Sequence, residues 1–318
     1  MNKDIKTIII NKILELIPSH IKPVDYLSEV LDISRESAYR RLGGKMSFYF
    51  EELIILSELL DFSLDELVAL KINNSKVVID LKINKDPTEG FLDKMRKYKA
   101  DVDNRFTDKS SSAIFALNYF PAEFSVHHKN LFKLAYYLWL HWRDRGVVKP
   151  KFSEVEIPAE LEELRSNINV KTRRLKNNSF ILDPNVFLTP LKLVRYFHDL
   201  ELINKEEIKI IKKDIHQILY FAEKMMRTSA TNSESNNYFY LSSFNIDVNS
   251  VYYEWNGKIT SSFSLNFFNR IVLTKPEICE AHKEWFLSMK KYSTLISGSN
   301  EVAQAEYFKK QREYVDWL

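Results

Sequence analysis

Glycine, cysteine and long apolar runs are all scarce in this chain of 318 residues, and each scarcity excludes a class of protein. The six glycines form neither a GxGxxG nor a GxxxxGK motif, which excludes the common phosphate-binding loops. The single cysteine, Cys279, excludes an internal disulfide framework and a cysteine-based zinc finger. The longest apolar run, Leu134–Leu140, is far shorter than the ~20 residues of a membrane-spanning helix. With no apolar signal core near Ile8–Ile10 either, we expect a cytoplasmic protein without metal or cofactor.

The rest of the composition is that of a globular protein. Apolar residues make up 45% and aromatic residues 13% of the chain, which suffices for packed cores, and the length predicts two domains. The abundance of Lys, Asn and Ile fits a bacterial source with an AT-rich genome. The net charge is only +3, so the distribution of charge is more informative than its sum.

One stretch near the N-terminus has the pattern of two short helices joined by a tight turn. The first helix is expected over Val24–Leu31, where apolar residues recur at spacings of three and four. A turn follows at Asp32–Ile33, and the hydroxyl of Ser34 is placed to cap a second helix over Arg35–Leu42. That helix is polar and basic, and it ends at Gly43–Gly44, where a positive φ costs little. This arrangement indicates a helix-turn-helix, whose second helix enters the DNA major groove, although many helical hairpins with this spacing bind nothing.

The flanking segments predict three further helices, so that about seventy residues form a five-helix unit with its own core. Apolar spacing predicts helices over Ile5–Ile17 and Ser47–Leu60, and a capping-box spacing from Ser63 to Glu66 predicts a short helix over Ser63–Leu70. Residues 1–70 carry 8 basic and 12 acidic side chains, which argues against indiscriminate DNA binding. The segment Ser34–Lys45, however, holds four basic residues against one Glu, while residues 46–70 hold six acids and no base. The positive charge is therefore concentrated around the second helix of the pair, where phosphate would lie.

The order LSEVLDIS–RESAYRRLGGK–EELIILSELLDFSLDEL resembles the phage-repressor/Cro-like (XRE-type) helix-turn-helix transcriptional regulators. Leu27 and Ser28 match the family's Leu-Ala pair, Ser34 its turn serine and Gly44 the glycine after its second helix. Leu59–Leu67 matches its closing segment. Asp32 replaces the usual turn glycine, and Ala38 is small for the buried position of the second helix. The resemblance covers residues 1–70 and implies a DNA-binding domain there.

A transcriptional regulator would use two sets of side chains on this helix. Base edges would be read by Arg35, Glu36, Tyr39 and Arg40, because Arg pairs with guanine and Glu accepts from cytosine. Ser34, Arg41 and Lys45 would hold phosphates and fix the orientation. One such module buries little surface, so we expect a homodimer on double-stranded DNA with a pseudo-palindromic site.

Residues 71–76 read as a linker, and residues 77–318 resemble no family. Their helices and strands do not alternate strictly, and the hairpin VYYEW–NG–KITSSF carries the turn signal Asn256–Gly257. We therefore expect a protein that is mainly α, with an α+β C-terminal domain that contains a small antiparallel sheet. Its strands are expected at 77–83, 112–120, 180–188, 236–244 and 250–265, and its helices at 91–102, 129–145, 160–166, 190–202, 205–226, 277–295 and 301–317.

Two helices of this region are candidates for a role in dimerisation or in binding a small-molecule effector. The helix over Lys205–Met226 has an a/d pattern typical of a dimer seam, made by Ile208, Ile211, Ile215, Ile218, Ala222 and Met225. The helix over Lys129–Arg145 is aromatic nearly all round, and a ligand pocket could be lined by Tyr136, Tyr137, Trp139 and Trp142. In both helices, packing into the core of a single chain is the alternative interpretation.

Catalytic signals are sparse, and we expect no enzymatic activity. Neither GxSxG nor HExxH occurs. His127–His128 and the pair Cys279–His282 are weak metal or redox candidates, and the basic run Lys171–Lys176 is a weak anion-binding candidate. Two alternatives to a regulator remain at this point: a helical scaffold that binds proteins, and an enzyme domain tethered to a DNA-binding head.

Overall fold

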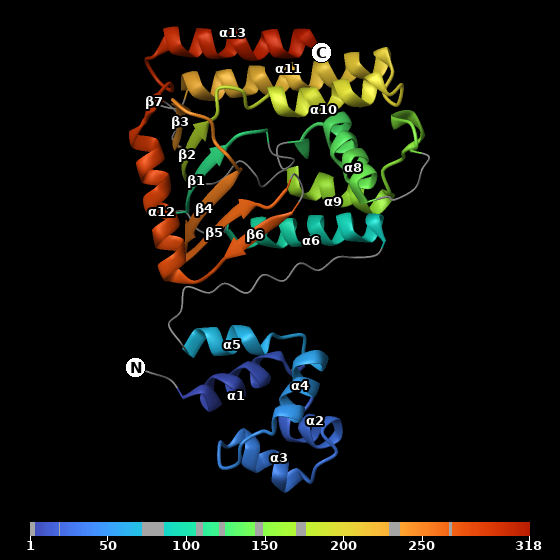
Figure 1. The fold of residues 1–318 in the computed structure, drawn as a ribbon, viewed down its shortest axis with the longest axis vertical. Helices are drawn as coiled ribbons and strands as arrows, with labels where there is room; N and C mark the ends of the chain where they lie inside the picture. Colours follow the sequence, from blue (N-terminus) through green and yellow to red (C-terminus); the bar gives the residue numbers. More distant parts are fainter. Residues whose placement is uncertain are drawn as a thin grey trace. The chain divides into compact units, whose positions relative to one another are not determined.

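A computed structural model describes residues 4–18, 20–71, 86–105, 111–120, 125–143, 149–169, 176–228, 236–266 and 269–318. The chain divides into two compact units, Met1–Leu81 and Lys82–Leu318, and helices and a mixed sheet give it a mixed α/β fold (Figure 1). The predicted linker 71–76 lies outside the described residues except for Lys71, which ends a helix, and so does the strand predicted at 77–83.

The N-terminal unit contains five helices close to the predicted ranges: α1 (Ile5–Leu16), α2 (Pro23–Val30), α3 (Arg35–Leu42), α4 (Phe50–Leu59) and α5 (Leu64–Lys71). The apolar spacing of these segments directs one face of each inward, so that Ile13, Leu27, Ala38 and Leu56 are completely buried in one core. Pro23 occupies the first turn of α2, where its missing N–H has no intrahelical partner to lose.

The larger unit is built on a seven-stranded mixed sheet with the strand order β6-β5-β4-β1-β2-β3-β7. Its strands are β1 (Ser112–Leu117), β2 (Asn177–Leu182), β3 (Asn236–Ser242), β4 (Ser250–Trp255), β5 (Lys258–Ser264), β6 (Arg270–Leu273) and β7 (Ser293–Leu295). The central strands β1, β2 and β3 are parallel, and the remaining pairs are antiparallel. The prediction of a small antiparallel sheet is therefore wrong, because the sheet has seven strands with a parallel centre, and only β1–β4, the β4–β5 hairpin, β5–β6 and β3–β7 pair in the antiparallel way.

The hairpin turn itself agrees with the sequence pattern. Asn256 and Gly257 have φ values of 46° and 70°, the left-handed conformations that a two-residue turn requires. Parallel strands, by contrast, need long crossovers. The chain between β1 and β2 contains α8 (Lys129–Arg143), a short 3-10 turn (Phe152–Glu154) and α9 (Ala159–Asn169), and the chain between β2 and β3 contains α10 (Leu188–Asp199) and α11 (Lys205–Thr228).

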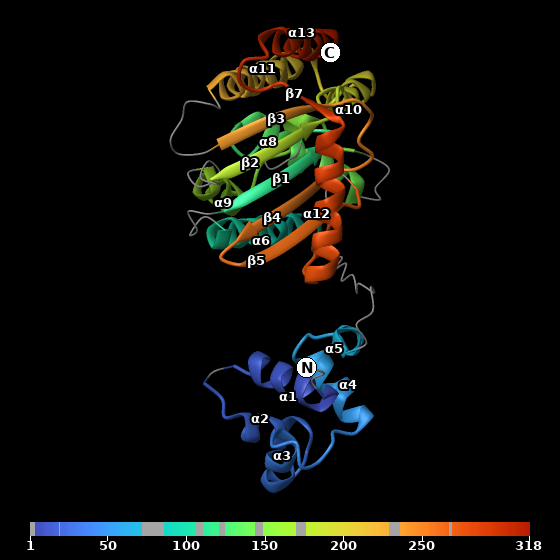
Figure 2. The same ribbon diagram turned by 90° about the vertical axis from the view of Figure 1, so that its left-hand side faces the viewer.

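Helices cover both faces of the sheet (Figure 2). One face packs against α12 (Pro276–Lys291) around a core that includes Ala116 and Ile181. The other packs against the crossover helices together with α6 (Pro87–Arg105) and α13 (Glu301–Trp317). On that face Phe115, Phe180 and Phe239 are in register on the three parallel strands, and their rings stack at centroid distances of 4.8 and 4.7 Å. Because successive side chains along a strand point to opposite faces, the sheet separates two apolar cores.

The dimer seam predicted on α11 is wrong, and its alternative, packing within one chain, holds. Ile208, Ile211, Ile215 and Ile218 are all buried in the core of the larger unit, and Ala222 and Met225 pack against it. Helices α8 and α13 and strand β3 contact α11. The a/d stripe is therefore satisfied inside one subunit and is not available to a second one.

The aromatic ligand pocket predicted on α8 is also wrong. Tyr136, Tyr137 and Trp139 are almost completely buried in the core, whereas Trp142 is 52% exposed. The polar ends of the three buried rings have partners within the fold: the Tyr136 hydroxyl meets Thr88, the Tyr137 hydroxyl donates to the Pro150 carbonyl, and the Trp139 indole donates to the Pro87 carbonyl. These side chains fix α8 against its neighbours.

Candidate nucleic-acid interface

The junction between α2 and α3 is fixed by local hydrogen bonds. The Ile33 amide donates to the Ser28 carbonyl at 3.1 Å, and the Ser28 hydroxyl donates back to the Ile33 carbonyl at 2.6 Å. Asp32 takes a φ of 49°, which Asp tolerates better than most residues. The backbone therefore reverses between the two helices with Asp in place of a turn glycine.

Helix α3 has one buried face and one exposed face. Ala38 is completely buried and Arg41 is 4% exposed, and these positions, three apart, lie against the rest of the unit. Arg35, Glu36, Tyr39 and Arg40 are all exposed, with Tyr39 at 65%. The four residues predicted to reach base edges thus share the outer surface of one helix.

Two residues at the start of α3, Ser34 and Arg35, each make one polar interaction within the unit. The Ser34 hydroxyl oxygen caps the helix by accepting from the Ser37 amide at 3.2 Å, which leaves its hydrogen for another acceptor. Arg35 pairs with Asp25 of α2 at 2.7 Å, but both side chains are exposed, and such pairs contribute only about 0–1 kcal/mol. Arg35 can therefore exchange Asp25 for another anion at little cost.

Arg41 does not lie where a phosphate contact requires it, so this prediction is wrong. Its guanidinium is buried and forms two parallel hydrogen bonds with the Glu52 carboxylate, at 2.9 Å from Nε and 2.7 Å from Nη2. Glu52 also accepts from the Tyr49 amide at 2.9 Å and so caps α4. Arg41 therefore fixes α3 to α4. Sequence reasoning missed this pair, since the only signal was the position of Arg41 three residues after the buried Ala38.

The remaining cations lie at the end of α3. The side chain of Arg40 is exposed and has no hydrogen-bond or ion-pair partner among the described residues, and Lys45 is exposed just after Gly44, whose φ is 71°. The Met46 amide donates to the Arg40 carbonyl at 3.1 Å, and this bond holds the turn after α3 against the end of the helix. Arg35, Arg40 and Lys45 are thus the basic side chains that α3 and its C-terminal turn present to solvent.

The weaker candidates do not form sites in the described part of the chain. Cys279 is buried and its thiol donates to the Leu273 carbonyl, while His282 Nδ1 faces the Ser261 hydroxyl at 2.5 Å. Burial lowers the pKa of His282 below its usual value. No group of three or more metal-ligating side chains occurs in the described segments, and of the basic run 171–176 only Lys176 is described.

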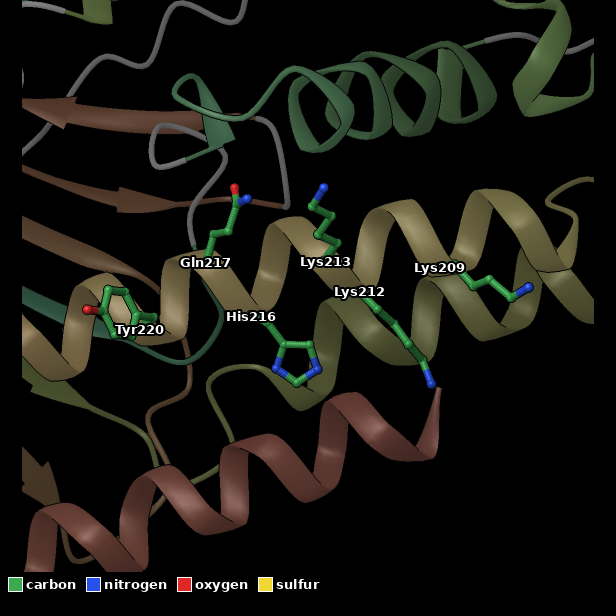
Figure 3. Close-up of a pocket in the computed structure, with 6 residues that line it drawn as sticks. All are labelled: Lys209, Lys212, Lys213, His216, Gln217 and Tyr220. Atoms are coloured by element: carbon green, nitrogen blue, oxygen red, sulfur yellow. The ribbon is translucent and has the colours of Figure 1, made fainter.

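A shallow hollow of about 610 Å³ on α11 also lacks the geometry of a site. Its six residues are Lys209, Lys212, Lys213, His216, Gln217 and Tyr220, all from this one helix, and their side chains point in different directions (Figure 3). Lys212 donates to the Asp316 carbonyl of α13 at 3.1 Å, and Lys209 pairs with Glu206. These cations belong to a solvated helix surface and do not converge on one ligand.

Comparison with known proteins gave no match: no family model, no curated protein and no solved structure matches this chain. None of the described helices is long and apolar enough to cross a membrane.

Proposed function

We propose that this protein is a sequence-specific, DNA-binding transcriptional regulator of the helix-turn-helix type. Residues 1–70 would be its DNA-binding domain, 71–76 a linker, and 77–318 a domain for effector sensing or oligomerisation. The observation that carries the proposal is the division of α3 into two faces: Arg35, Glu36, Tyr39 and Arg40 are exposed together, while Ala38 and Arg41 anchor the opposite face. A rigidly held helix with a polar and basic outer face suits the major groove.

The roles of the side chains follow from their chemistry. The guanidinium of Arg40, which has no hydrogen-bond or ion-pair partner among the described residues, can donate two parallel hydrogen bonds to guanine. Glu36 can accept from cytosine, and Tyr39 can contact a base edge or a thymine methyl group. Ser34 and Lys45, at the two ends of the helix, would hold phosphates. Arg41 does not contact DNA in this proposal, because its guanidinium is bonded to Glu52 and fixes α3 to α4.

A homodimer on double-stranded DNA is part of the proposal. One helix-turn-helix module contacts few bases, so useful affinity requires two modules on a pseudo-palindromic site. The apolar stripe of α11 cannot supply the dimer contact, since it is buried within one chain.

The test is a fluorescence-anisotropy titration with a DNA site selected from a random library, repeated across salt concentrations. We expect affinity to fall steeply with salt, and Arg40→Ala to weaken binding by about 1–3 kcal/mol, the contribution of a bidentate base contact. Lys309→Ala, which removes an exposed positive charge from α13, is the matched control and should leave affinity unchanged.

Failure to select any site, or equal affinities for Arg40→Ala and the wild type, would contradict the proposal. A loss of affinity in Lys309→Ala as large as that in Arg40→Ala would indicate attraction by net charge alone and would also contradict a base contact.

A second candidate, a helical protein-interaction scaffold, is favoured by the surface of α4. Phe50, Ile54, Ile55 and Leu59 of this helix are all exposed, Phe50 to 67% and Leu59 to 58%. Contiguous exposed apolar side chains are typical of protein-binding surfaces. A scaffold predicts no salt-dependent DNA binding and no effect of Arg40→Ala, so the same titration separates the two functions.

A further inference from the structure

Helix α4 lies on one side of the N-terminal unit (Figure 2), and its outer surface consists of two adjacent rows of exposed side chains. Residues four apart form such rows along a helix. One row is made by Phe50, Ile54 and Glu58, and the other by Glu51, Ile55 and Leu59. Because a row of side chains from a second helix packs between two rows of this kind, the surface has the form of a helix-binding site.

Each row also carries a carboxylate without a partner. Glu52, the third glutamate of α4, is bonded to Arg41. Glu51 and Glu58, by contrast, are exposed and have no hydrogen-bond or ion-pair partner among the described residues. They lie at opposite ends of the apolar surface, about 10 Å apart along the axis at a rise of 1.5 Å per residue. Residues 46–70 contain no basic residue, so this surface is acidic as well as apolar.

The positions of these two carboxylates disfavour a second copy of the chain as the partner. In an antiparallel pair of α4 helices centred on Ile54 and Ile55, Glu51 would face the Glu58 of the second copy. In a parallel pair, each glutamate would face its own counterpart. Like charges placed together at an interface oppose association. DNA and anionic membranes are disfavoured for the same reason, since both are negatively charged.

We propose that the outer surface of α4 binds a basic amphipathic helix of another protein. Apolar side chains of that helix would pack against Ile54 and Ile55, and two cations seven residues apart would pair with Glu51 and Glu58. The bond between Arg41 and Glu52 already fixes α4 in place, so little ordering is required on binding. That the bound helix brings a second protein to DNA rests on the proposed function; binding of the helix does not.

The test is a display selection of helical peptides on the full-length protein. In the library, leucine occupies one face of the helix, and two flanking positions seven residues apart are randomised. Peptides that also bind the double variant Ile54→Ser, Ile55→Ser are removed by counter-selection. Both isoleucines are exposed, so this variant should keep its fold, which circular dichroism checks. We expect the selected peptides to carry Arg or Lys at both randomised positions.

A second measurement isolates the contribution of the two carboxylates. The double variant Glu51→Gln, Glu58→Gln should bind a selected peptide about tenfold more weakly, the effect of two partly exposed ion pairs, and should reduce the salt dependence of binding. The double variant Glu15→Gln, Glu29→Gln removes the same charge from exposed positions on α1 and α2. It is the matched control and should leave the affinity unchanged.

Several outcomes would overturn the proposal. They are a selection that yields no peptide, selected peptides without a cation at both randomised positions, and equal losses of affinity in the two glutamate variants. A dimer that dissociates on Ile54→Ser, Ile55→Ser in analytical ultracentrifugation would show that a second copy occupies the surface, and would also overturn it. None of these readouts involves DNA, so a failure here is distinguishable from a failure of DNA binding.

Discussion

Arg40 and Arg41 are adjacent in the chain and lie on different faces of α3, one exposed and the other buried. Arg40 is exposed, whereas the guanidinium of Arg41 is buried against the Glu52 carboxylate. The two residues have the same charge and the same helix propensity, so their local sequence does not separate them. The difference lies in Glu52, eleven residues away on the next helix, and a tertiary contact of this kind leaves no periodic signal.

Arg41→Met should destabilise the N-terminal unit by about 3–5 kcal/mol, because it leaves the Glu52 carboxylate buried without its partner. The double variant Arg41→Met, Glu52→Leu should recover much of that loss, since well-packed apolar residues can replace a buried ion pair. Urea unfolding monitored by circular dichroism measures both. An Arg41→Met variant of unchanged stability, with a reduced salt dependence of DNA binding, would instead indicate a phosphate contact.

Helices and the β4–β5 hairpin could be predicted from the sequence because they depend on residues close together in the chain. Helix α3 has the predicted bounds, Arg35–Leu42, and the Asn256–Gly257 turn has the expected positive φ values. The parallel centre of the sheet depends on contacts between strands about sixty residues apart, which periodicity cannot reveal. The strand β7, three residues long, lies inside the predicted helix 277–295 because it is too short to show an alternating pattern.

The candidate sites could likewise be predicted where they depend on local spacing, and not where they depend on tertiary contacts. The exposed residues of α3 could be chosen from helical spacing alone. The apolar stripe on α11 and the aromatic residues of α8 are buried in the core. Their sequence could not distinguish a core face from a binding face, because both kinds of face have the same composition.

The packing of α11 predicts the outcome of a substitution in its stripe. Ile211→Ala should lower the free energy of unfolding of the larger unit by about 2–5 kcal/mol, because Ile211 is completely buried. Ile210→Ala, at a neighbouring position that is 47% exposed, is the matched control and should have a small effect. Urea unfolding at two protein concentrations measures the change. A midpoint that depends on concentration in the wild type and not in Ile211→Ala would restore the dimer seam.

At the scale of the whole molecule, each of the two compact units has its own core. Leu27 is completely buried in the core of the N-terminal unit, and Ile211 in that of the larger unit. Because a unit with its own core unfolds cooperatively, the chain should not behave as a single two-state system.

Calorimetry should therefore resolve two transitions, of which Leu27→Ala shifts one and Ile211→Ala shifts the other. The double variant should shift each transition by the same amount as the corresponding single variant, as expected for independent sites that share no contact partners. A single transition that moves with either substitution would show that the two units unfold together.

The place of β1 in the sheet has a consequence for the newly made polypeptide. β1 is flanked by β2 on one side and by β4 on the other, and β4 follows it in the chain by more than a hundred residues. At a synthesis rate of about 5–20 residues per second, the ribosome needs on the order of ten seconds to supply that second neighbour. Throughout this interval one edge of an apolar strand has no native partner, and unpaired edges attract other chains. We expect aggregation during expression to begin at this edge, and to decrease when translation of the segment between β1 and β4 is made faster.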